Sequence, residues 1–350
     1  MANTTIAQEQ PIVTGGVDTH LDIHVAAAVD GLGRTLATSE FSTDGAGHQQ
    51  MLDWLRGHGR LDRVGVEGTG SYGAGLARFM VGSGIEVIEV SRPDRRKRRL
   101  KGKSDVLDAE AAARATLAGT AVGKPKAGTG QVEMIRVLRA TRYSAVKART
   151  QAGNQLQALV VTAPDQLREG LRGLSIFKLA TKAAGFRRGP LISPEAAYKQ
   201  ALGALARRWK QLGREIAELD ASLARVVPKA APALVSLVGV GAEVAATLLV
   251  AAGDNPERLT SESAFAALCG VSPLPASSGK TQRHRLNRGG NRQANRALWT
   301  VVMTRLRYDD RTRRYAARRS NEALSKAEII RCLKRYVARE VYRALPTVVA

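Results

Sequence analysis

The chain has few cysteines and no recognisable targeting segment. Its 350 residues include two cysteines, Cys269 and Cys332, which lie far apart in the sequence. Neither has a second cysteine or a histidine at metal-ligand spacing, which argues against a disulfide framework or a zinc site and favours a reducing compartment. The opening MANTTIAQEQP has neither a basic start nor an apolar stretch. We therefore expect no signal peptide.

Long apolar runs are also scarce, and one segment is long enough to span a membrane. From Leu234 to Gly253 the sequence is mostly apolar over about twenty residues. Glu243 lies at its middle, where a charge costs roughly 2.5–3.5 kcal/mol on membrane insertion, and Gly239 and Gly241 interrupt it. We predict a buried helical hairpin instead. Helix, Gly-x-Gly turn and helix is also the pattern of helix-hairpin-helix segments that bind DNA phosphates, although any tight turn favours glycine.

Basic residues are scarce at the N-terminus and abundant in the rest of the chain. The net charge is +23, yet residues 1–94 contain 6 Lys and Arg against 12 Asp and Glu. Residues 280–350 contain 19 Lys and Arg against 5 Asp and Glu, a net charge of +14. GC-rich codon usage would favour arginine over lysine, but it does not explain so uneven a distribution. The pattern predicts a nucleic-acid partner and a phosphodiester substrate.

The N-terminal part alternates β-like runs with helical segments. VTGGVDTH, DIHVAAAVD and RTLATSEF predict three tightly connected strands, and RVGVEG and IEVIEVS predict two more. Helices are expected over residues 45–57, where Met51, Leu52 and Leu55 have helical spacing, and over residues 74–82. Strands that alternate with helices predict a mixed α/β sheet covered by helices.

Four acidic residues of this part form the strongest candidate site. Asp18 and Glu67 lie at or near the ends of predicted strands, and Asp105 and Asp108 lie three residues apart on one face of a predicted helix. Carboxylates gathered in one place repel one another unless a cation neutralises them. Because we expect no histidine or cysteine nearby, the oxygen ligands favour Mg²⁺ over zinc. The set predicts a site for two Mg²⁺ ions, with Mn²⁺ as a substitute.

A basic run, RRKRRLKGK, directly precedes the predicted helix that carries the acidic pair. Most charge runs are solvated surfaces. This one adjoins the carboxylates, so we interpret it as a phosphate-binding segment. The candidate residues are Arg95, Arg96, Lys97, Arg98, Arg99, Lys101 and Lys103.

Beyond a linker at residues 123–130, the pattern is mostly helical. Two long helices are expected between residues 131 and 227, separated by an irregular segment. The second helix has apolar residues at alternating spacings of three and four, which suits either an intramolecular helix pair or an oligomer interface. These residues are Leu202, Leu205, Trp209, Leu212, Ile216, Leu219 and Leu223. Two helices, over residues 292–306 and 322–345, are expected to close the chain.

The loop-like stretch from Gly270 to Gly290 contains a candidate nucleophile. Long loops inside a compact domain tend to be functional, and this one includes Ser277 and Ser278 in the motif ASSGK. A serine hydroxyl is a poor nucleophile unless a neighbouring group removes its proton or lowers its pKa. No His–Asp pair is evident near it in the sequence, and the nearby His284 alone is more often structural. Both serines can equally be ordinary loop residues.

These elements together resemble the DEDD-type insertion-sequence transposases. The resemblance rests on the acidic quartet, the basic helical middle, GVSPLPASSGK and RGGNRQANRALW, in this order, and it extends over nearly the whole chain. It implies a RuvC-like, RNase H-fold N-terminal domain with a metal-binding tetrad at Asp18, Glu67, Asp105 and Asp108. It also implies a C-terminal transposase domain whose nucleophile matches Ser278, with Ser277 as the alternative.

The resemblance further implies partners, a location and domain limits. Members are recombinases that act on donor and target duplex DNA, guided by a structured RNA that the element encodes, and exchange of two duplexes implies a homodimer or homotetramer. Lys280, Arg292 and Arg296 are expected to bind phosphate, and the bacterial cytoplasm, at the nucleoid, is the expected location. The expected regions are a catalytic domain at 12–125, a coiled-coil region at 131–227, a transposase domain at 228–320 and a basic helix at 321–350.

Three other functions remain open at this level. A junction-resolving, RuvC-like nuclease would use the same four carboxylates to activate water, without a serine intermediate. An actin-like sugar kinase has a similar first hairpin, but it needs an adenosine-binding glycine motif late in the chain and has no use for a basic C-terminus. A non-catalytic nucleic-acid-binding protein would bind without the tetrad.

Overall fold

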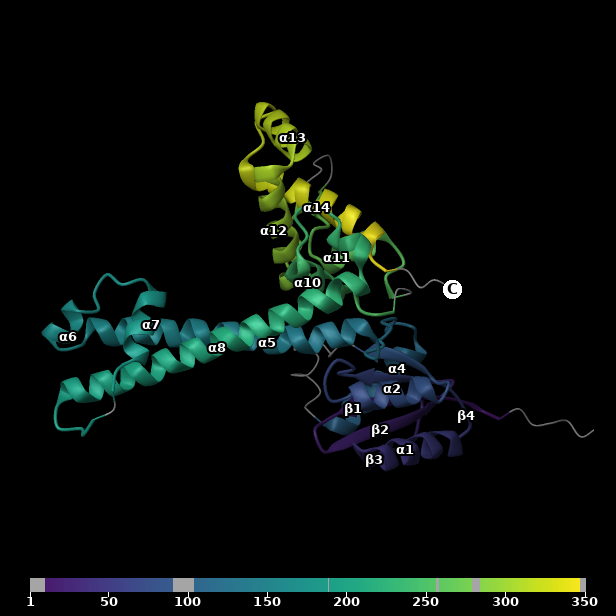
Figure 1. Cartoon of the computed structure of the whole chain (residues 1–350). Helices are drawn as coiled ribbons and strands as arrows, with labels where there is room; N and C mark the ends of the chain where they lie inside the picture. Colours follow the sequence, from purple (N-terminus) through teal and green to yellow (C-terminus); the bar gives the residue numbers. More distant parts are fainter. Residues whose placement is uncertain (1–9, 91–103, 188, 256–257, 279–283, 347–350) are drawn as a thin grey trace, which may run out of the picture. The chain divides into compact units, whose positions relative to one another are not determined.

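The computed structural model describes residues 10–90, 104–187, 189–255, 258–278 and 284–346. Two compact units are present (Figure 1). The first contains the described residues up to Thr129 together with the separate segment Gly253–Arg258, and the second contains the remainder. The basic run at residues 95–103 and Lys280 lie outside the described residues. Further divisions at residues 228 and 321 stay predictions.

A five-stranded sheet with the order β3-β2-β1-β4-β5 forms the centre of the first unit. The central strand β1 (Ile12–Thr19) pairs antiparallel with β2 (Ile23–Asp30), which pairs antiparallel with β3 (Thr35–Ser42). On its other side β1 pairs parallel with β4 (Arg60–Glu67), which pairs parallel with β5 (Glu86–Val90). The predicted mixed sheet of an RNase H-like domain is therefore confirmed.

Helices cover both faces of this sheet. Helices α1 (Gly45–Gly57) and α2 (Ala74–Gly82) pack on one face through an apolar core, and α4 (Asp105–Leu117) packs on the other. The first helix begins at its predicted position because the Asp44 carboxylate accepts a hydrogen bond from Gly47 N, 2.8 Å away. Most of the buried apolar side chains lie on the α1 side of the sheet, and a smaller cluster of Val25, Ala27 and Ala109 lies on the α4 side.

One titratable group is buried on the α1 side of the sheet. The His24 ring is fully buried, stacks on the ring of His48 at a centroid distance of 5.7 Å, and has no hydrogen-bond partner among the described residues. Burial, together with the smaller effects of the neighbouring His48 and His20, lowers the pKa of His24 to about 4. Burial also lowers the pKa of His48, against the opposing effect of Asp44. His24 is thus neutral in the folded protein at neutral pH.

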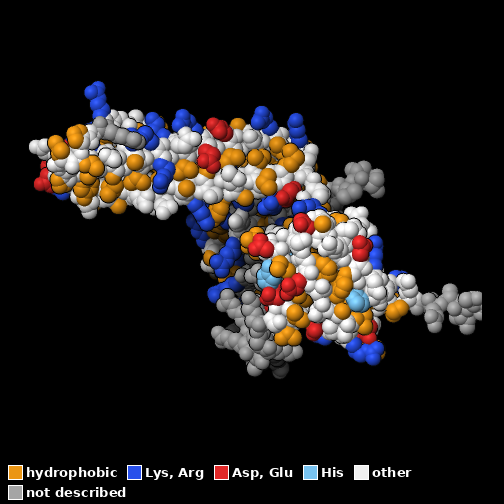
Figure 2. Space-filling view, turned by 90° about the horizontal axis from the view of Figure 1, so that it is seen from below, with side chains coloured by type: hydrophobic (Ala, Val, Ile, Leu, Met, Phe, Trp, Pro, Cys, Tyr) orange, Lys and Arg blue, Asp and Glu red, His pale blue; other side chains and the backbone are white. Residues whose placement is uncertain are grey.

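The second unit begins with two long helices, α5 (Gln131–Val161) and α8 (Pro194–Ala230), which pack along each other (Figure 1). The shorter α6 (Asp165–Glu169) and α7 (Ile176–Ala184) lie in the segment that joins them. Four of the apolar residues predicted to form a packing stripe on α8, each seven positions from the next, are buried: Leu202, Trp209, Ile216 and Leu223. This stripe therefore packs against other helices of the same chain. Lys and Arg side chains are spread over the surface of this helix pair (Figure 2).

The rest of the second unit is also helical, apart from a short β-pair. Leu248, Phe265, Leu298 and Val337 are among its fully or almost fully buried core residues. Its elements are α9 (Pro232–Val235), α10 (Ala242–Ala252), α11 (Glu262–Leu268), β6 (Leu274–Pro275), β7 (His284–Arg285), α12 (Arg292–Tyr308), α13 (Asp310–Asn321) and α14 (Lys326–Ala344).

Two features of this region differ from the sequence prediction. Helix α13 was not predicted, because its sequence DRTRRYAARRSN has almost no apolar periodicity. It begins at a cap, in which the Asp309 carboxylate accepts a hydrogen bond from Thr312 N at 2.8 Å. The last helix begins at Lys326 rather than at residue 322, because Ser325 and Glu328 form a capping box.

The apolar segment after Pro232 is a buried turn and helix. Within the described residues, no helix is both long and apolar enough to cross a membrane. The first helix of the predicted hairpin, α9, has only four residues, and Gly239 makes the following turn with a φ of 83°. Glu243 lies in the first turn of α10, where its carboxylate is 3.2 Å from Arg139 Nε and 3.8 Å from Arg142 Nη1. These guanidinium groups account for the charge within the apolar run.

Candidate active site

Strand pairing places two of the predicted carboxylates side by side. Val17 of β1 is the register partner of Val66 of β4, and both side chains are buried on the α1 side. Because side chains alternate along a strand, the next residues, Asp18 and Glu67, share the opposite face. The Thr19 hydroxyl donates a hydrogen bond to the backbone oxygen of Glu67 at 2.9 Å and joins the two strand ends.

Helix α4 lies directly against this face because two strand positions lack side chains. A Cβ on Gly16 would lie 2.2 Å from Ala113 N, and a Cβ on Gly65 would lie 2.1 Å from Thr116 Oγ1. The facing side of the helix has small residues, which permits this close approach. Contact at these glycines fixes the first turn of α4, which carries Asp105 and Asp108, near Asp18.

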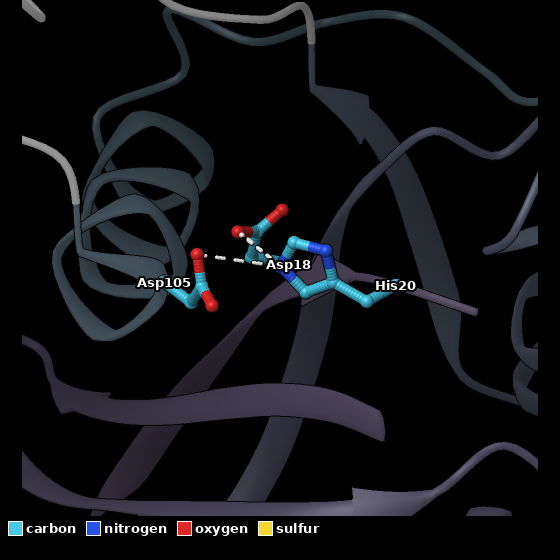
Figure 3. Close-up of side chains that lie close together, drawn as sticks. All are labelled: Asp18, His20 and Asp105. Atoms are coloured by element: carbon cyan, nitrogen blue, oxygen red, sulfur yellow. Dashed lines mark hydrogen bonds and ion pairs between the residues drawn. The ribbon is translucent and has the colours of Figure 1, made fainter. Parts of the chain in front are cut away.

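A histidine completes the cluster (Figure 3). The ring atom His20 Nε2 lies 3.2 Å from Asp18 Oδ2 and 3.4 Å from Asp105 Oδ1. One ligand atom from each of these three residues lies within 4.8 Å of the other two. The expectation that no histidine lies near the carboxylates was therefore wrong. His20 follows the end of β1 by one residue, and the chain turns there so that its ring reaches back to Asp18.

Three of the four carboxylates are largely withdrawn from solvent. Asp18, Glu67 and Asp108 are 6%, 4% and 8% exposed, whereas the Asp105 side chain is about half exposed. Burial raises the pKa of Asp18; His20 lowers it, and the neighbouring Asp108 and Asp105 carboxylates raise it. The ionised form of Asp18 is thus held at a cost that a bound cation would remove. On the same unit, Asp and Glu side chains gather beside a histidine at the surface (Figure 2).

The donor set fits a divalent metal ion. Carboxylate oxygens are the ligands that Mg²⁺ and Mn²⁺ prefer. The His20 nitrogen is a softer donor, which widens the choice toward transition metals. In the structure its ring bridges two of the carboxylates, in the region that a cation would neutralise.

The candidate nucleophile belongs to the second unit. Ser277 and Ser278 are both exposed and follow β6, which pairs antiparallel with β7. In this pair Pro275 is the register partner of His284, so His284 is a strand residue, and its side chain is also exposed. The two serines thus project beyond a short hairpin stem. Whether they join the carboxylates in one site stays a prediction.

A close backbone contact between two glycines and the side chain of an asparagine hold the two ends of this serine segment together. A Cβ on Gly290 would lie 2.2 Å from Gly270 N, so the two backbones meet where no side chain fits. Asn295 Nδ2 donates hydrogen bonds to Cys269 O at 2.9 Å and to Gly270 O at 3.2 Å. Lys334 Nζ donates to Asn295 Oδ1 at 2.9 Å. The two ends of the segment are therefore held together by α12 and α14.

The GGN motif has a structural role that the sequence did not reveal. Asn291 is the N-cap of α12, and its side chain accepts hydrogen bonds from Gln293 N and Ala294 N, both at 3.0 Å. Arg292 and Arg296 lie one turn apart on this helix and are both exposed. Their predicted phosphate contacts remain untested.

An RNase H-like sheet with acidic residues at adjoining strand ends and on the helix that covers them is compatible with a metal-dependent enzyme acting on phosphodiester bonds, such as a DEDD-type transposase or a RuvC-like nuclease. Residues 15–163 match the IS110-type DEDD family model, described as "Transposase". Residues 231–317 match a second model, described as "Transposase IS116/IS110/IS902 family". The chain therefore belongs to the IS110 family of insertion-sequence transposases. No curated protein matches it.

The matched regions include most of the predicted site residues. The first match includes all four acidic residues, and the second includes Ser278, Arg292 and Arg296. The protein is thus a DNA transposase, an enzyme that cleaves and rejoins DNA. Helix α8 lies between the two matches, and the second match ends within α13.

Proposed function

We propose that this transposase transfers DNA strands through a covalent intermediate on Ser278, assisted by a divalent metal ion at Asp18, Glu67, Asp105 and Asp108. The observation that carries the proposal is the buried acidic cluster, in which the pKa of Asp18 is raised by burial and by its carboxylate neighbours. Such a cluster is costly without a cation. The exposed serine segment, held at its base by Asn295, supplies a hydroxyl on a fixed stem.

The four carboxylates would hold Mg²⁺, as one or two ions, or Mn²⁺ in its place. When bound, the metal neutralises charge on the scissile phosphate and on the departing oxygen. His20 orients the cluster, because its ring nitrogen lies within hydrogen-bonding distance of Asp18 and near Asp105. A second role for His20, as a direct ligand, is compatible with the same geometry.

The chemical step exchanges one phosphate ester for another. The Ser278 oxygen attacks the phosphorus atom, its proton passes to solvent or a neighbouring base, and the bond from phosphorus to one deoxyribose oxygen breaks. The released oxygen takes up a proton and becomes a free hydroxyl end. A hydroxyl of the second DNA molecule later attacks the phosphoserine and frees Ser278. Because the number of phosphoester bonds is conserved, rejoining needs no ATP.

Two duplexes require several active sites, which favours a homodimer or homotetramer.

Serine variants test the proposed nucleophile. Ser278→Ala should abolish both the covalent protein–DNA adduct, detected on a denaturing gel, and strand transfer. Ser277→Ala is the matched control, one residue away and also exposed, and should retain both. Asp18→Asn should lose cleavage while DNA binding persists. Cleavage by Ser278→Ala at the wild-type rate would mean that water is the nucleophile and that the protein is a RuvC-like nuclease.

We also propose that a structured RNA encoded by the element selects the target, as the resemblance implies. In such systems base pairing reads the sequence and the protein binds shape and backbone. Purified protein should transfer strands only with RNA transcribed from the DNA that flanks its gene. Exchanging the complementary loop of that RNA should move the insertion site. Equal, equally targeted strand transfer without RNA would refute this part of the proposal.

A further inference from the structure

Helix α13 is rich in arginine and has few buried residues. Within its twelve residues, Thr312 is the one buried side chain, and five residues are arginines. Figure 1 shows α13 at the end of α12 that lies away from α10 and α11. Tyr315 and Ala316 pack partly buried against the core of the unit, and most of the remaining surface of the helix is polar and charged. Its surface chemistry is therefore the feature to explain.

Three of these arginines form a row along one side of the helix, Arg311, Arg314 and Arg318. Their spacings of three and four residues place them on one face, over a length of about 10 Å. The side chains of Arg311 and Arg318 are 87% and 67% exposed, and Arg314 is exposed as well. The row thus presents three guanidinium groups to solvent.

Acidic neighbours leave most of this charge available. The carboxylate of Glu340 lies 4.0 Å from Arg311, and that of Glu322 lies 3.8 Å from Arg318. No carboxylate of a described residue forms an ion pair with Arg314, whose Nε contacts the Asp310 backbone oxygen at 3.4 Å. Exposed pairs at such distances contribute little energy. An anionic partner can therefore replace them without a large penalty.

An exposed aromatic ring directly precedes the N-cap of this helix. Tyr308 is 75% exposed and ends α12, directly before Asp309, the cap of α13. Its neighbour Arg307 is exposed too. Aromatic rings next to arginines are typical of surfaces that bind nucleic acid, where the rings stack on bases and the arginines bind phosphates. The combination favours nucleic acid over an acidic protein surface.

We propose that Arg311, Arg314 and Arg318 bind the phosphodiester backbone of a nucleic acid and form an anchoring site of the second unit that is separate from the chemical step. Guanidinium groups bind phosphate oxygens in pairs, and a row of them can contact successive phosphates. The inference rests on the proposed function only in expecting a nucleic-acid partner. Duplex DNA and the structured RNA share this backbone chemistry, and the two are distinguished by experiment.

The test is the salt dependence of binding by the triple variant Arg311→Gln, Arg314→Gln, Arg318→Gln. Binding of the full chain to a labelled DNA duplex and to a labelled RNA hairpin is measured without metal, between about 50 and 200 mM salt. Loss of three phosphate contacts should reduce the slope of log K against log salt by about 2 to 3. Affinity at physiological salt should fall about tenfold to hundredfold.

Two further variants separate phosphate binding from total charge and from folding. Arg172→Gln, Lys178→Gln, Arg187→Gln removes three exposed charges near α6 and α7 and should keep the wild-type slope. The corresponding Arg→Lys triple in α13 keeps the charge and should retain most of the slope. Thermal unfolding should be nearly unchanged in all three variants, because none of the six substituted positions is buried.

The outcomes decide both the proposal and the kind of nucleic acid. A reduced slope for the hairpin alone assigns the row to RNA, and a reduced slope for the duplex assigns it to DNA. If the Gln triple in α13 binds both ligands as the control triple does, the proposal is wrong. Because the assay needs neither metal nor Ser278, failure of the serine mechanism would not affect this result.

Discussion

Replacing Gly16 by alanine should damage the acidic site without touching a carboxylate. The new Cβ would lie 2.2 Å from Ala113 N and 2.3 Å from Ala109 O, where real Cβ atoms essentially never come within 3.0 Å. Both are backbone atoms of α4, so no side-chain rotation can relieve the clash. The helix must therefore retreat from β1 by about 0.8 Å or more, as the difference between 3.0 and 2.2 Å requires.

This displacement carries Asp105 and Asp108 away from Asp18, because all of α4 moves with its backbone. Overpacking of this kind costs about 1–3 kcal/mol in stability, and a misplacement of about 1 Å at a reaction centre can cost on the order of 10²-fold in rate. We expect Gly16→Ala to lose roughly 10²-fold in metal-dependent DNA cleavage. The Mg²⁺ concentration for half-maximal activity should rise as well. Cleavage rates over a Mg²⁺ titration, with urea unfolding, measure both effects.

A glycine without close neighbours provides the control. Gly57 ends α1, and a Cβ there would meet nothing within 4 Å. Gly57→Ala should keep full activity and gain up to about 1 kcal/mol in stability, because alanine restricts the unfolded chain. Wild-type cleavage and an unchanged Mg²⁺ requirement in Gly16→Ala would refute the argument that close contact of α4 with β1 positions the site.

Three other variants test buried and connecting groups. The unfolded chain protonates His24 near pH 6.5 and the folded protein only near pH 4, so stability falls as pH drops between these values, by about 2 kcal/mol at pH 5. In urea unfolding at pH 7 and pH 5, His24→Leu should lose less stability between the two pH values than the wild type does. An equal loss in the variant would contradict the role given to His24. Asp18→Asn removes a buried negative charge next to other carboxylates, so it should raise the melting temperature measured in the presence of a chelator. In the wild type, Mg²⁺ binding should raise the melting temperature, and the variant should lose this increase. If the variant keeps the increase, the metal binds elsewhere. Asn295→Ala leaves Lys334 and the Cys269 and Gly270 carbonyls without this partner, so limited proteolysis near the serine segment should accelerate and adduct formation should fall. Unchanged proteolysis and adduct yield would show that this contact does not position the segment.

Local patterns in the sequence were enough to predict the elements and the acidic residues. The strands of the N-terminal unit, α1 and α2 follow from alternation and helical spacing between near neighbours, and all were confirmed. The heptad of buried residues from Leu202 to Leu223 is equally local. Asp18 and Glu67 were identified because they end apolar runs, and parallel pairing of β1 with β4 then places them together. Helix α13 escaped prediction because arginine-rich helices have no apolar period.

Contacts between distant residues were decided by the tertiary structure alone. Residues 253–258 return to the first unit, where Asp254 accepts a hydrogen bond from Gly128 N at 3.1 Å and Arg258 pairs with Glu89 at 3.3 Å. The four carboxylates could be identified in the sequence. The position of the His20 ring between Asp18 and Asp105 could not, because it depends on how the chain turns after β1. The sequence also does not show that residue 16 must lack a side chain so that α4 can pack against β1. Such relations depend on how packed elements lie in space, since periodicity reports which side of an element is buried and not which atoms meet there.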